Sequence, residues 1–229
     1  MLGLNYKLEK LEKARTPILT GIIGAGQMGQ GMVSQMYLME GMNPAVVVDI
    51  NTELAKKALL HAGVSEDKIK YTKCPCEADE WIAQGNFIIT DDSKVVTDSK
   101  KIEVLIEATG VTEVGAKIAL DTIMGKKHLV MLNAETDVVI GPLLKKLADN
   151  AGVVYTGAAG DEPAATKELY DFAKAAGFDV RVIGKGKNNK IDKDCNPDTV
   201  AEEAERRGVS AHMLASFKEG SKTMVELAV

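Results

Sequence analysis

Three glycines near the N-terminus constrain the fold more than any other feature of the chain. Gly24, Gly26 and Gly29 have the spacing G-x-G-x-x-G, between an apolar run over 17–23 and an amphipathic segment over 32–39. This order predicts a strand, a tight turn and a helix. In such a turn the first glycine permits the reversal, the second lets the backbone approach a pyrophosphate, and the third lets the helix lie on the strand. The free N–H groups at the helix start then face the phosphates, so the turn predicts a dinucleotide site.

An acidic residue at the expected distance supports this interpretation. The apolar run over 45–48 ends at Asp49, 20 positions after Gly29 (49 − 29). A carboxylate at this point can accept hydrogen bonds from the adenosine ribose. Because it would repel a 2′-phosphate and no arginine follows it, NAD is favoured over NADP. Lys56 and Lys57 lie one to two helical turns away, and both cofactors remain open.

Composition narrows the class of protein. The chain has 229 residues, with 45% hydrophobic and 27% charged, enough for one large core or one domain and part of a second. A net charge of −5 argues against a nucleic-acid partner, and no apolar run is long enough to predict a membrane span. Three cysteines leave at least one unpaired, which favours a reduced, cytoplasmic protein. We interpret Cys74-Pro75-Cys76 as a loop rather than a metal or redox pair.

Alternating apolar and amphipathic segments predict an α/β, Rossmann-type, doubly wound parallel sheet over 17–157, after an N-terminal helix within 1–16. The expected strands are 45–48, 87–90, 104–107, 129–132 and 153–155, and the expected helices are 52–61 (capped by Asn51), 77–84, 114–124 and 140–150.

The pattern of the sequence changes after Gly157, which predicts a second, smaller α/β (α+β) catalytic or substrate domain over 158–229. We expect a helix over 164–176, a strand over 178–184, a lysine-dense loop, and helices over 199–207 and 211–229. Because the last residues form an apolar run, we expect this domain to be partial, truncated at its C-terminus.

Several motifs resemble a known family. The turn Glu107-Ala108-Thr109-Gly110 and the strand end 131–135 resemble the NAD-binding domain of homoserine dehydrogenases. Segments 184–189 and 216–226 are similar to a divergent branch that carries a C-terminal SAF domain and includes a deoxyxylulose-phosphate reductoisomerase-like enzyme. The resemblance implies an NAD(P)-dependent oxidoreductase with a catalytic domain beginning near Gly157, and a homodimer.

The resemblance, together with the glycine turn, also implies a set of site residues. Those expected at the cofactor are Gly24, Ala25, Gly26, Gln27, Met28, Gly29, Asp49, Ala108, Thr109, Gly110, Asn133 and Ala134. Those expected at the substrate are Glu135, Asp161, Asn188 and Asn189, and no metal is expected. Glu135 occupies the position of a lysine in homoserine dehydrogenases, so we do not expect authentic homoserine dehydrogenase activity.

The chemistry of hydride transfer selects the catalytic candidates. Reducing a carbonyl builds negative charge on its oxygen, which requires a proton donor or a fixed cation. Lysine can be either, and we expect Lys185, Lys187 or Lys222 in this role. Lys185 and Lys187 could instead lie in a solvated loop, and Lys222 could be an exposed lysine on a helix. Asp161 could be a helix cap.

The predicted function is therefore an NAD(P)-dependent dehydrogenase or reductase. It would transfer a hydride between nicotinamide and a small polar or phosphorylated carbonyl or hydroxy compound. The alternative is a dinucleotide-binding redox sensor without catalytic activity.

Overall fold

The computed structural model describes residues 3–186 and 189–229, which form two compact units. One unit comprises the residues up to 136 together with 140–156, and the other comprises 137–139 and 157–229.

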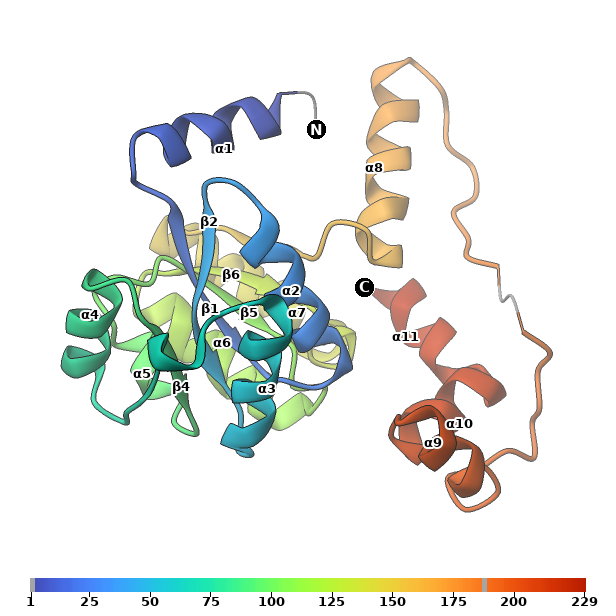
Figure 1. The fold of residues 1–229 in the computed structure, drawn as a ribbon. Coiled ribbons are helices and arrows are strands. Elements are labelled where there is room, and N and C mark those ends of the chain that lie inside the picture. Colours follow the sequence, from blue (N-terminus) through green and yellow to red (C-terminus); the bar gives the residue numbers. More distant parts are fainter. Residues whose placement is uncertain (1–2, 187–188) are drawn as a thin grey trace. The chain divides into compact units, whose positions relative to one another are not determined.

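A seven-stranded sheet forms the centre of the first unit (Figure 1). Its strand order is β3-β4-β2-β1-β5-β6-β7. The strands are β1 Ile18–Ile23, β2 Met42–Val48, β3 Ile69–Tyr71, β4 Phe87–Thr90, β5 Val104–Glu107, β6 His128–Met131 and β7 Tyr155–Gly157. β1 pairs in parallel with β2 on one side and with β5 on the other, so the strand order reverses its direction beside β1.

Helices cover both faces of this sheet. They are α1 Leu4–Lys13, α2 Gln27–Leu38, α3 Thr52–Ala62, α4 Pro75–Ala83, α5 Lys94–Thr97, α6 Thr112–Met124 and α7 Ala134–Ala151. Successive strand residues enter opposite cores: Ile22 packs in the cluster that contains α2 and α3 residues, and Ile23 in the cluster that contains α4, α6 and α7 residues. Period-two alternation of buried side chains on both faces is typical of a doubly wound fold, and the expected fold class is confirmed.

Two helix ends follow directly from capping residues. The Asn51 side chain accepts a hydrogen bond from the Glu53 N–H, and α3 ends at Gly63 in the left-handed region (φ 100°). Asn133 caps α7 in the same way, so the helix expected over 140–150 begins earlier, at Ala134. A side-chain oxygen at the cap replaces the missing acceptor for an N–H of the first turn.

The loop interpretation of Cys74-Pro75-Cys76 is wrong. α4 begins at Pro75, Cys74 is its N-cap residue, and both cysteines are exposed with free thiols. Proline fits the first turn of a helix because its missing N–H would have no acceptor there.

The second unit contains four helices among its described residues: α8 Glu162–Ala175, α9 Ala201–Arg207, α10 Ala211–Glu219 and α11 Ser221–Ala228. A small core of Cys195, Val200, Ala204, Leu214 and Ala215 joins α9 and α10. The helix expected over 211–229 is interrupted at Gly220, which has φ 104°.

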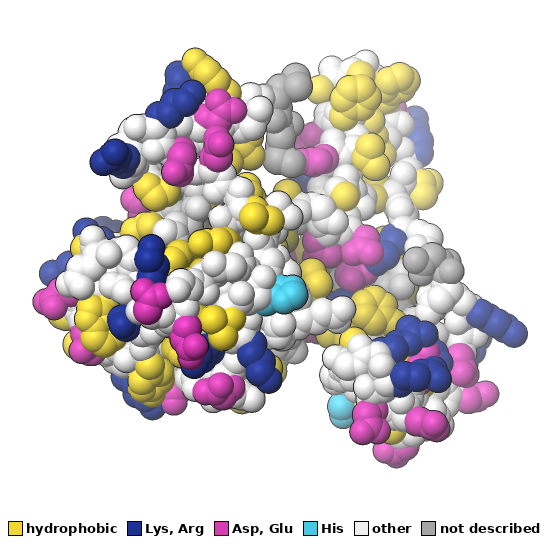
Figure 2. All heavy atoms as spheres, in the orientation of Figure 1, with side chains coloured by type: hydrophobic (Ala, Val, Ile, Leu, Met, Phe, Trp, Pro, Cys, Tyr) yellow, Lys and Arg dark blue, Asp and Glu magenta, His cyan; other side chains and the backbone are white. Residues whose placement is uncertain are grey.

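The strand expected over 178–184 is wrong. These residues have no regular structure, and Val182 is 86% exposed. A segment with alternating apolar and polar residues is stable as a strand only where another strand pairs with it. No described segment after residue 161 forms a strand that could pair with 178–184. Apolar side chains are also exposed on α8, where Leu169 is 71% and Phe172 is 74% exposed. Figure 2 shows hydrophobic side chains at the surface of this helix.

The surface carries charges of both signs. Figure 2 shows Lys and Arg side chains interspersed with Asp and Glu on the visible face. None of the helices that the structure describes has the length and apolar character needed to cross a bilayer.

A buried lysine supports the loop before β5, and its removal tests this part of the fold. Lys127 is 9% exposed, and its Nζ donates hydrogen bonds to the carbonyls of Ser99 and Ile102. Burial lowers the pKa of Lys127. We expect Lys127→Met to reduce the free energy of unfolding by about 2–4 kcal/mol, because two carbonyls lose their donor. Urea denaturation measures this, with Lys100→Met at an exposed position as the control; equal losses in the two variants would contradict the account.

Candidate functional site

The loops that follow β1, β2, β5 and β6 meet at one edge of the sheet. Gly24 N–H donates to the Val48 carbonyl at 2.8 Å, and Ala108 N–H donates to the Ile23 carbonyl at 2.8 Å. Leu132 N–H donates to the Glu107 carbonyl at 2.9 Å. This edge is the carboxyl end of the strands beside the reversal of strand order, where open α/β sheets bind their ligands.

The three glycines of the turn have different structural tasks. Gly24 has φ 101°, and a Cβ on it would lie 2.6 Å from the Ala108 carbonyl oxygen. A Cβ on Gly29 would lie 1.8 Å from the Gly24 carbonyl oxygen. A Cβ on Gly26, by contrast, would meet nothing within 4 Å. The first and third glycines are therefore required for packing, whereas the second borders open space.

The first turn of α2 presents N–H groups to this space. Gly26 is the N-cap residue, and the Gln30 N–H is bonded to its carbonyl at 2.9 Å. The N–H groups of the preceding residues, Gln27 to Gly29, have no acceptor within the helix because of helix geometry. They lie at the positive end of the helix dipole, and Gln27 and Met28 are exposed. This arrangement can hold a phosphate.

Asp49 is held in place by two backbone groups. Its Oδ2 accepts a hydrogen bond from Ala25 N–H at 2.7 Å, and its Oδ1 accepts one from Asn51 N–H at 2.8 Å. Each carboxylate oxygen can accept a further hydrogen bond, so the ribose hydroxyls remain possible donors.

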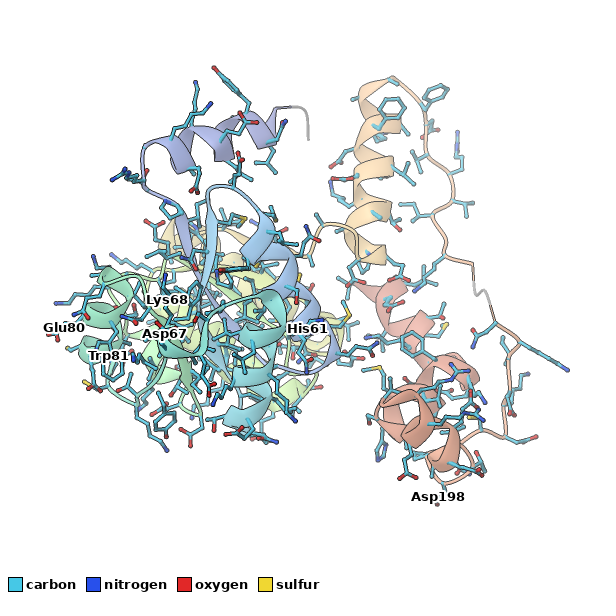
Figure 3. The ribbon with its side chains drawn as sticks, viewed as in Figure 1. His61, Asp67, Lys68, Glu80, Trp81 and Asp198 are labelled. Carbon is cyan, nitrogen blue, oxygen red and sulfur yellow. The ribbon has the colours of Figure 1, made fainter. Side chains whose placement is uncertain are left out.

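Lys56 is bound elsewhere on the surface. Its Nζ lies 2.5 Å from Glu66 in the short turn Glu66–Lys68, where Figure 3 labels Asp67 and Lys68. The hydrogen bond to Glu66 raises the pKa of Lys56. An ammonium group paired in this way is not directed at a 2′-phosphate.

The turn after β5 is anchored by a buried carboxyl group. Glu107 is fully buried, and its Oε1 accepts hydrogen bonds from both the N–H and the hydroxyl of Thr109. Burial raises the pKa of Glu107, and the charge of Glu135 raises it further, against the lowering effect of the Thr109 and Asn133 groups. Gly110 completes the turn with φ 68° and is exposed.

Asn133 and Ala134 lie at the same edge but are 2% and 5% exposed. The Asn133 Oδ1 accepts the Thr136 N–H at 3.1 Å, so this side chain serves the helix cap. A contact between Asn133 and a cofactor would therefore involve its backbone. Glu135 follows in the first turn of α7 and is half-buried.

The second unit brings three predicted residues together. Lys185 forms ion pairs with Glu226 and, at 2.8 Å, with Glu162. Lys222 lies 4.0 Å from Glu226 one helical turn away on α11. Asp161 is the N-cap residue of α8, beside Glu162. We call these five residues the lysine–carboxylate cluster.

Sequence reasoning missed Glu162 and Glu226 as members of the cluster. The spacing of Glu226 from Lys222 (i, i+4) is the signal that indicates this pair. The link between Lys185 and α11 spans 41 positions and carries no signal in the sequence.

The two carboxyl groups at the start of α8 differ in their electrostatics. Burial raises the pKa of Asp161, and its hydrogen bond with Glu162 raises it further. The hydrogen bond from Lys185 lowers the pKa of Glu162. The surroundings therefore shift the pKa values of these two adjacent carboxyl groups in opposite directions.

Carboxylate oxygens of Asp161, Glu162 and Glu226 all lie within 4.8 Å of one another, a spacing that metal ligands can have. Lys185 and Lys222 already supply counter-charges to these carboxylates. We therefore interpret the cluster as ion pairs.

The described residues of the lysine-dense loop line two different pockets. Lys185 lines a pocket of about 300 Å³ with Tyr170, Ile183 and Leu227. Asn189 lines a different pocket, of about 780 Å³, together with basic residues such as Arg207. Lys187 and Asn188 lie outside the described residues.

Comparison with known proteins agrees with this geometry. A family model described as "Oxidoreductase DRL, catalytic domain" matches residues 160–229, which is less than half of the chain. No curated protein matches the sequence. The family match bears out the expectation of an oxidoreductase.

Solved structures share the fold. The chain is 16% identical to the WlbA dehydrogenase of Bordetella pertussis, solved with NADH and UDP-GlcNAcA; the match covers 70% of this chain and 40% of that one, with a TM-score of 0.50. It is 15% identical to myo-inositol dehydrogenase of Lactobacillus casei, solved with NAD(H) and myo-inositol; here 69% and 42% are covered, with a TM-score of 0.49. The matched part of the chain thus spans about two fifths of the length of these proteins.

The raised pKa of Glu107 predicts a pH dependence of stability. The unfolded chain releases this proton at a lower pH than the folded chain, so the contribution of Glu107 is greatest below the ordinary glutamate pKa and is lost as the pH rises through the folded-state pKa. We expect the free energy of unfolding of the wild type, relative to Glu107→Gln, to fall with pH over this interval and then level off.

Urea denaturation between about pH 4 and pH 8 measures this difference. Glu103→Gln, an exposed carboxylate before β5, controls for the change of net charge. Parallel pH curves for the wild type and Glu107→Gln would contradict the assignment.

Proposed function

We propose that this chain contains the dinucleotide-binding part and residues of the catalytic part of an NAD(P)-dependent oxidoreductase. The observation that carries the proposal is the turn Gly24–Gly29 with Asp49 at its side, placed at the carboxyl edge of a parallel sheet beside the strand reversal. The α2 first turn would bind the pyrophosphate and Asp49 the ribose.

NAD fits this site better than NADP. The Asp49 carboxylate would repel a 2′-phosphate, and Lys56 is paired with Glu66. The solved dehydrogenases of the same fold from B. pertussis and L. casei contain NADH and NAD(H).

The lysine–carboxylate cluster would supply the acid–base chemistry. When bound, the nicotinamide donates or accepts the hydride at the substrate carbon. Lys222 would stabilise the negative charge on the substrate oxygen or transfer its proton, and Lys185 would assist as a second cation. Asp161, the N-cap residue of α8, would be a further polar group beside them.

The substrate proposed is a small polar or phosphorylated carbonyl or hydroxy compound. The basic residues of the larger pocket, which include Lys190, Lys193 and Arg207, suit an anionic group on such a substrate. We further propose that the chain is related to the homoserine dehydrogenase-like branch whose members carry a SAF domain. We also propose that the protein is cytoplasmic and forms a homodimer. Glu135, at the position of a lysine in homoserine dehydrogenases, argues for a substrate other than homoserine.

A redox sensor without catalytic activity is the second candidate. The ion pairs of Lys185 and Lys222 with carboxylates favour it, because such pairs stabilise structure without any reaction. Turnover separates the two candidates, as tested below.

Two glycine variants form a matched pair for the cofactor site. Gly26→Ala places a methyl group in open space, so we expect wild-type stability but at least about tenfold weaker binding of NADH, because the methyl group blocks the pyrophosphate. Gly29→Ala collides with the Gly24 carbonyl, so we expect a loss of stability of about 2 kcal/mol or more. NADH fluorescence titration and thermal unfolding measure both; unchanged NADH affinity in Gly26→Ala would contradict the site.

Lysine variants test the proposed chemistry. With a panel of hydroxy acids and sugar phosphates, we expect Lys222→Met to lower kcat at least about 100-fold with little change in NADH affinity. Lys174→Met, an exposed lysine on α8, is the matched control. Tight NADH binding by the wild type with no turnover on any compound would favour the sensor.

A further inference from the structure

A buried carboxyl group outside the predicted site connects two of its turns. Glu107 ends β5, and it is adjacent to the turn 108–110 in sequence and to the start of α7 in space. We propose that Glu107 is a positioning residue that holds the turns 108–110 and 133–134 in the arrangement that binds the dinucleotide. This inference rests on the function proposed above and deepens it.

The first connection is to Thr109. One carboxylate oxygen, Oε1, accepts the Thr109 N–H at 2.9 Å and also its hydroxyl. A carboxylate that accepts both donors fixes the backbone and the side chain of the turn together. Val111 N–H in turn donates to the Thr109 hydroxyl oxygen at 3.3 Å, so the order extends to the start of α6.

The second connection is to Asn133. The Glu107 Oε2 and the Asn133 Nδ2 are both buried, and neither has a hydrogen bond of normal geometry among the described residues, although Asn133 lies close enough to lower the pKa of Glu107. They face the same point: a Cβ on Gly115 would lie 2.9 Å from the first atom and 2.8 Å from the second. The glycine allows α6 to close this polar pocket, which contains an acceptor and a donor that lack other partners.

The orientation of the Asn133 amide makes the pair complementary. Its Oδ1 accepts the Thr136 N–H, so the NH₂ group is the one directed at Glu107. A carboxylate oxygen is the acceptor that this NH₂ group requires. Because a buried polar atom without a partner is costly, a small movement that joins the two is favourable. Glu107 would then tie the turn after β5 to the turn after β6.

Burying the Glu107 carboxyl group has an electrostatic cost, which is consistent with a positioning role for this residue. Burial raises the pKa of Glu107, and the charged group that acts on it is Glu135 on α7, which raises it further. An apolar residue would avoid this cost but would leave Thr109 and Asn133 without their acceptor.

A pair of exchanged side chains tests the proposal. Glu107→Gln sets an amide NH₂ against the NH₂ of Asn133, and Asn133→Asp sets two carboxylates against each other. In the double variant a Gln amide faces an Asp carboxylate, which restores one donor and one acceptor while the Thr109 and Thr136 bonds are kept. We expect each single variant to weaken NADH binding by about tenfold and the double variant to return to within about threefold of the wild type.

The variant Asn133→Ser tests the same interaction if the exchanged variants do not fold. Serine is a good helix cap, so it can keep the acceptor for the Thr136 N–H while removing the NH₂ group that faces Glu107. Because Asn133 is only 2% exposed, its side chain does not reach a bound cofactor. We expect unfolding midpoints close to the wild type and NADH binding weakened about fivefold.

The outcomes separate the two proposals. If the wild type binds neither NADH nor NADPH, the proposed function is wrong. If the wild type binds NADH, and Asn133→Ser and the folded single variants bind it equally well, Glu107 does not position the site. Changes confined to the unfolding midpoint, with NADH affinity unchanged, would also overturn the inference, because a purely structural residue behaves in that way.

Discussion

The close approach of α2 to the end of β1 is the constraint on which the rest of the site depends. A Cβ on Gly29 would lie 1.8 Å from the Gly24 carbonyl oxygen, so the helix can begin at this distance only because residue 29 is glycine. The approach brings Ala25 N–H within 2.7 Å of Asp49 and the turn against Ala108. One backbone contact thus sets the positions of the helix start, the acidic residue and the neighbouring turn.

Polar groups at this edge are used in two different ways. Asp49 has both oxygens bonded to backbone N–H groups and remains half-exposed, as suits a group that also contacts a ligand. Glu107 is fully buried and serves the protein itself, through Thr109 and the amide of Asn133. A carboxylate in contact with solvent retains its charge easily, whereas a buried one has a raised pKa and depends on neighbouring donors.

Local features of the fold were predictable from the sequence, and long-range ones were not. The glycine turn, the Asn51 cap and the strands expected over 45–48, 87–90 and 104–107 are encoded within a few positions, and the structure has them where expected. The strand expected over 153–155 lies instead at Tyr155–Gly157. The strand expected over 178–184 failed because alternation says nothing about whether another strand is present to pair with it. The break between α10 and α11 depends on the left-handed conformation of Gly220. The sequence shows a glycine at this position but not the conformation that it adopts.

The candidate site shows the same division. Gly24 and Asp49 could be named because their spacing reports a known geometry. Glu107 beside Asn133, and Lys185 beside Glu226, are brought together by packing over 26 and 41 positions (133 − 107 and 226 − 185), and no spacing rule relates them. The burial that raises the pKa of Glu107 is likewise a property of the folded state.

A crystal structure of the protein with NADH tests the central claim most directly. The account predicts the pyrophosphate within hydrogen-bond distance of the N–H groups of Gln27 and Met28, in front of Gly26, with the adenosine ribose hydroxyls on the Asp49 carboxylate. NADH bound away from the carboxyl edge of β1 and β5, or with its phosphates remote from the start of α2, would contradict it.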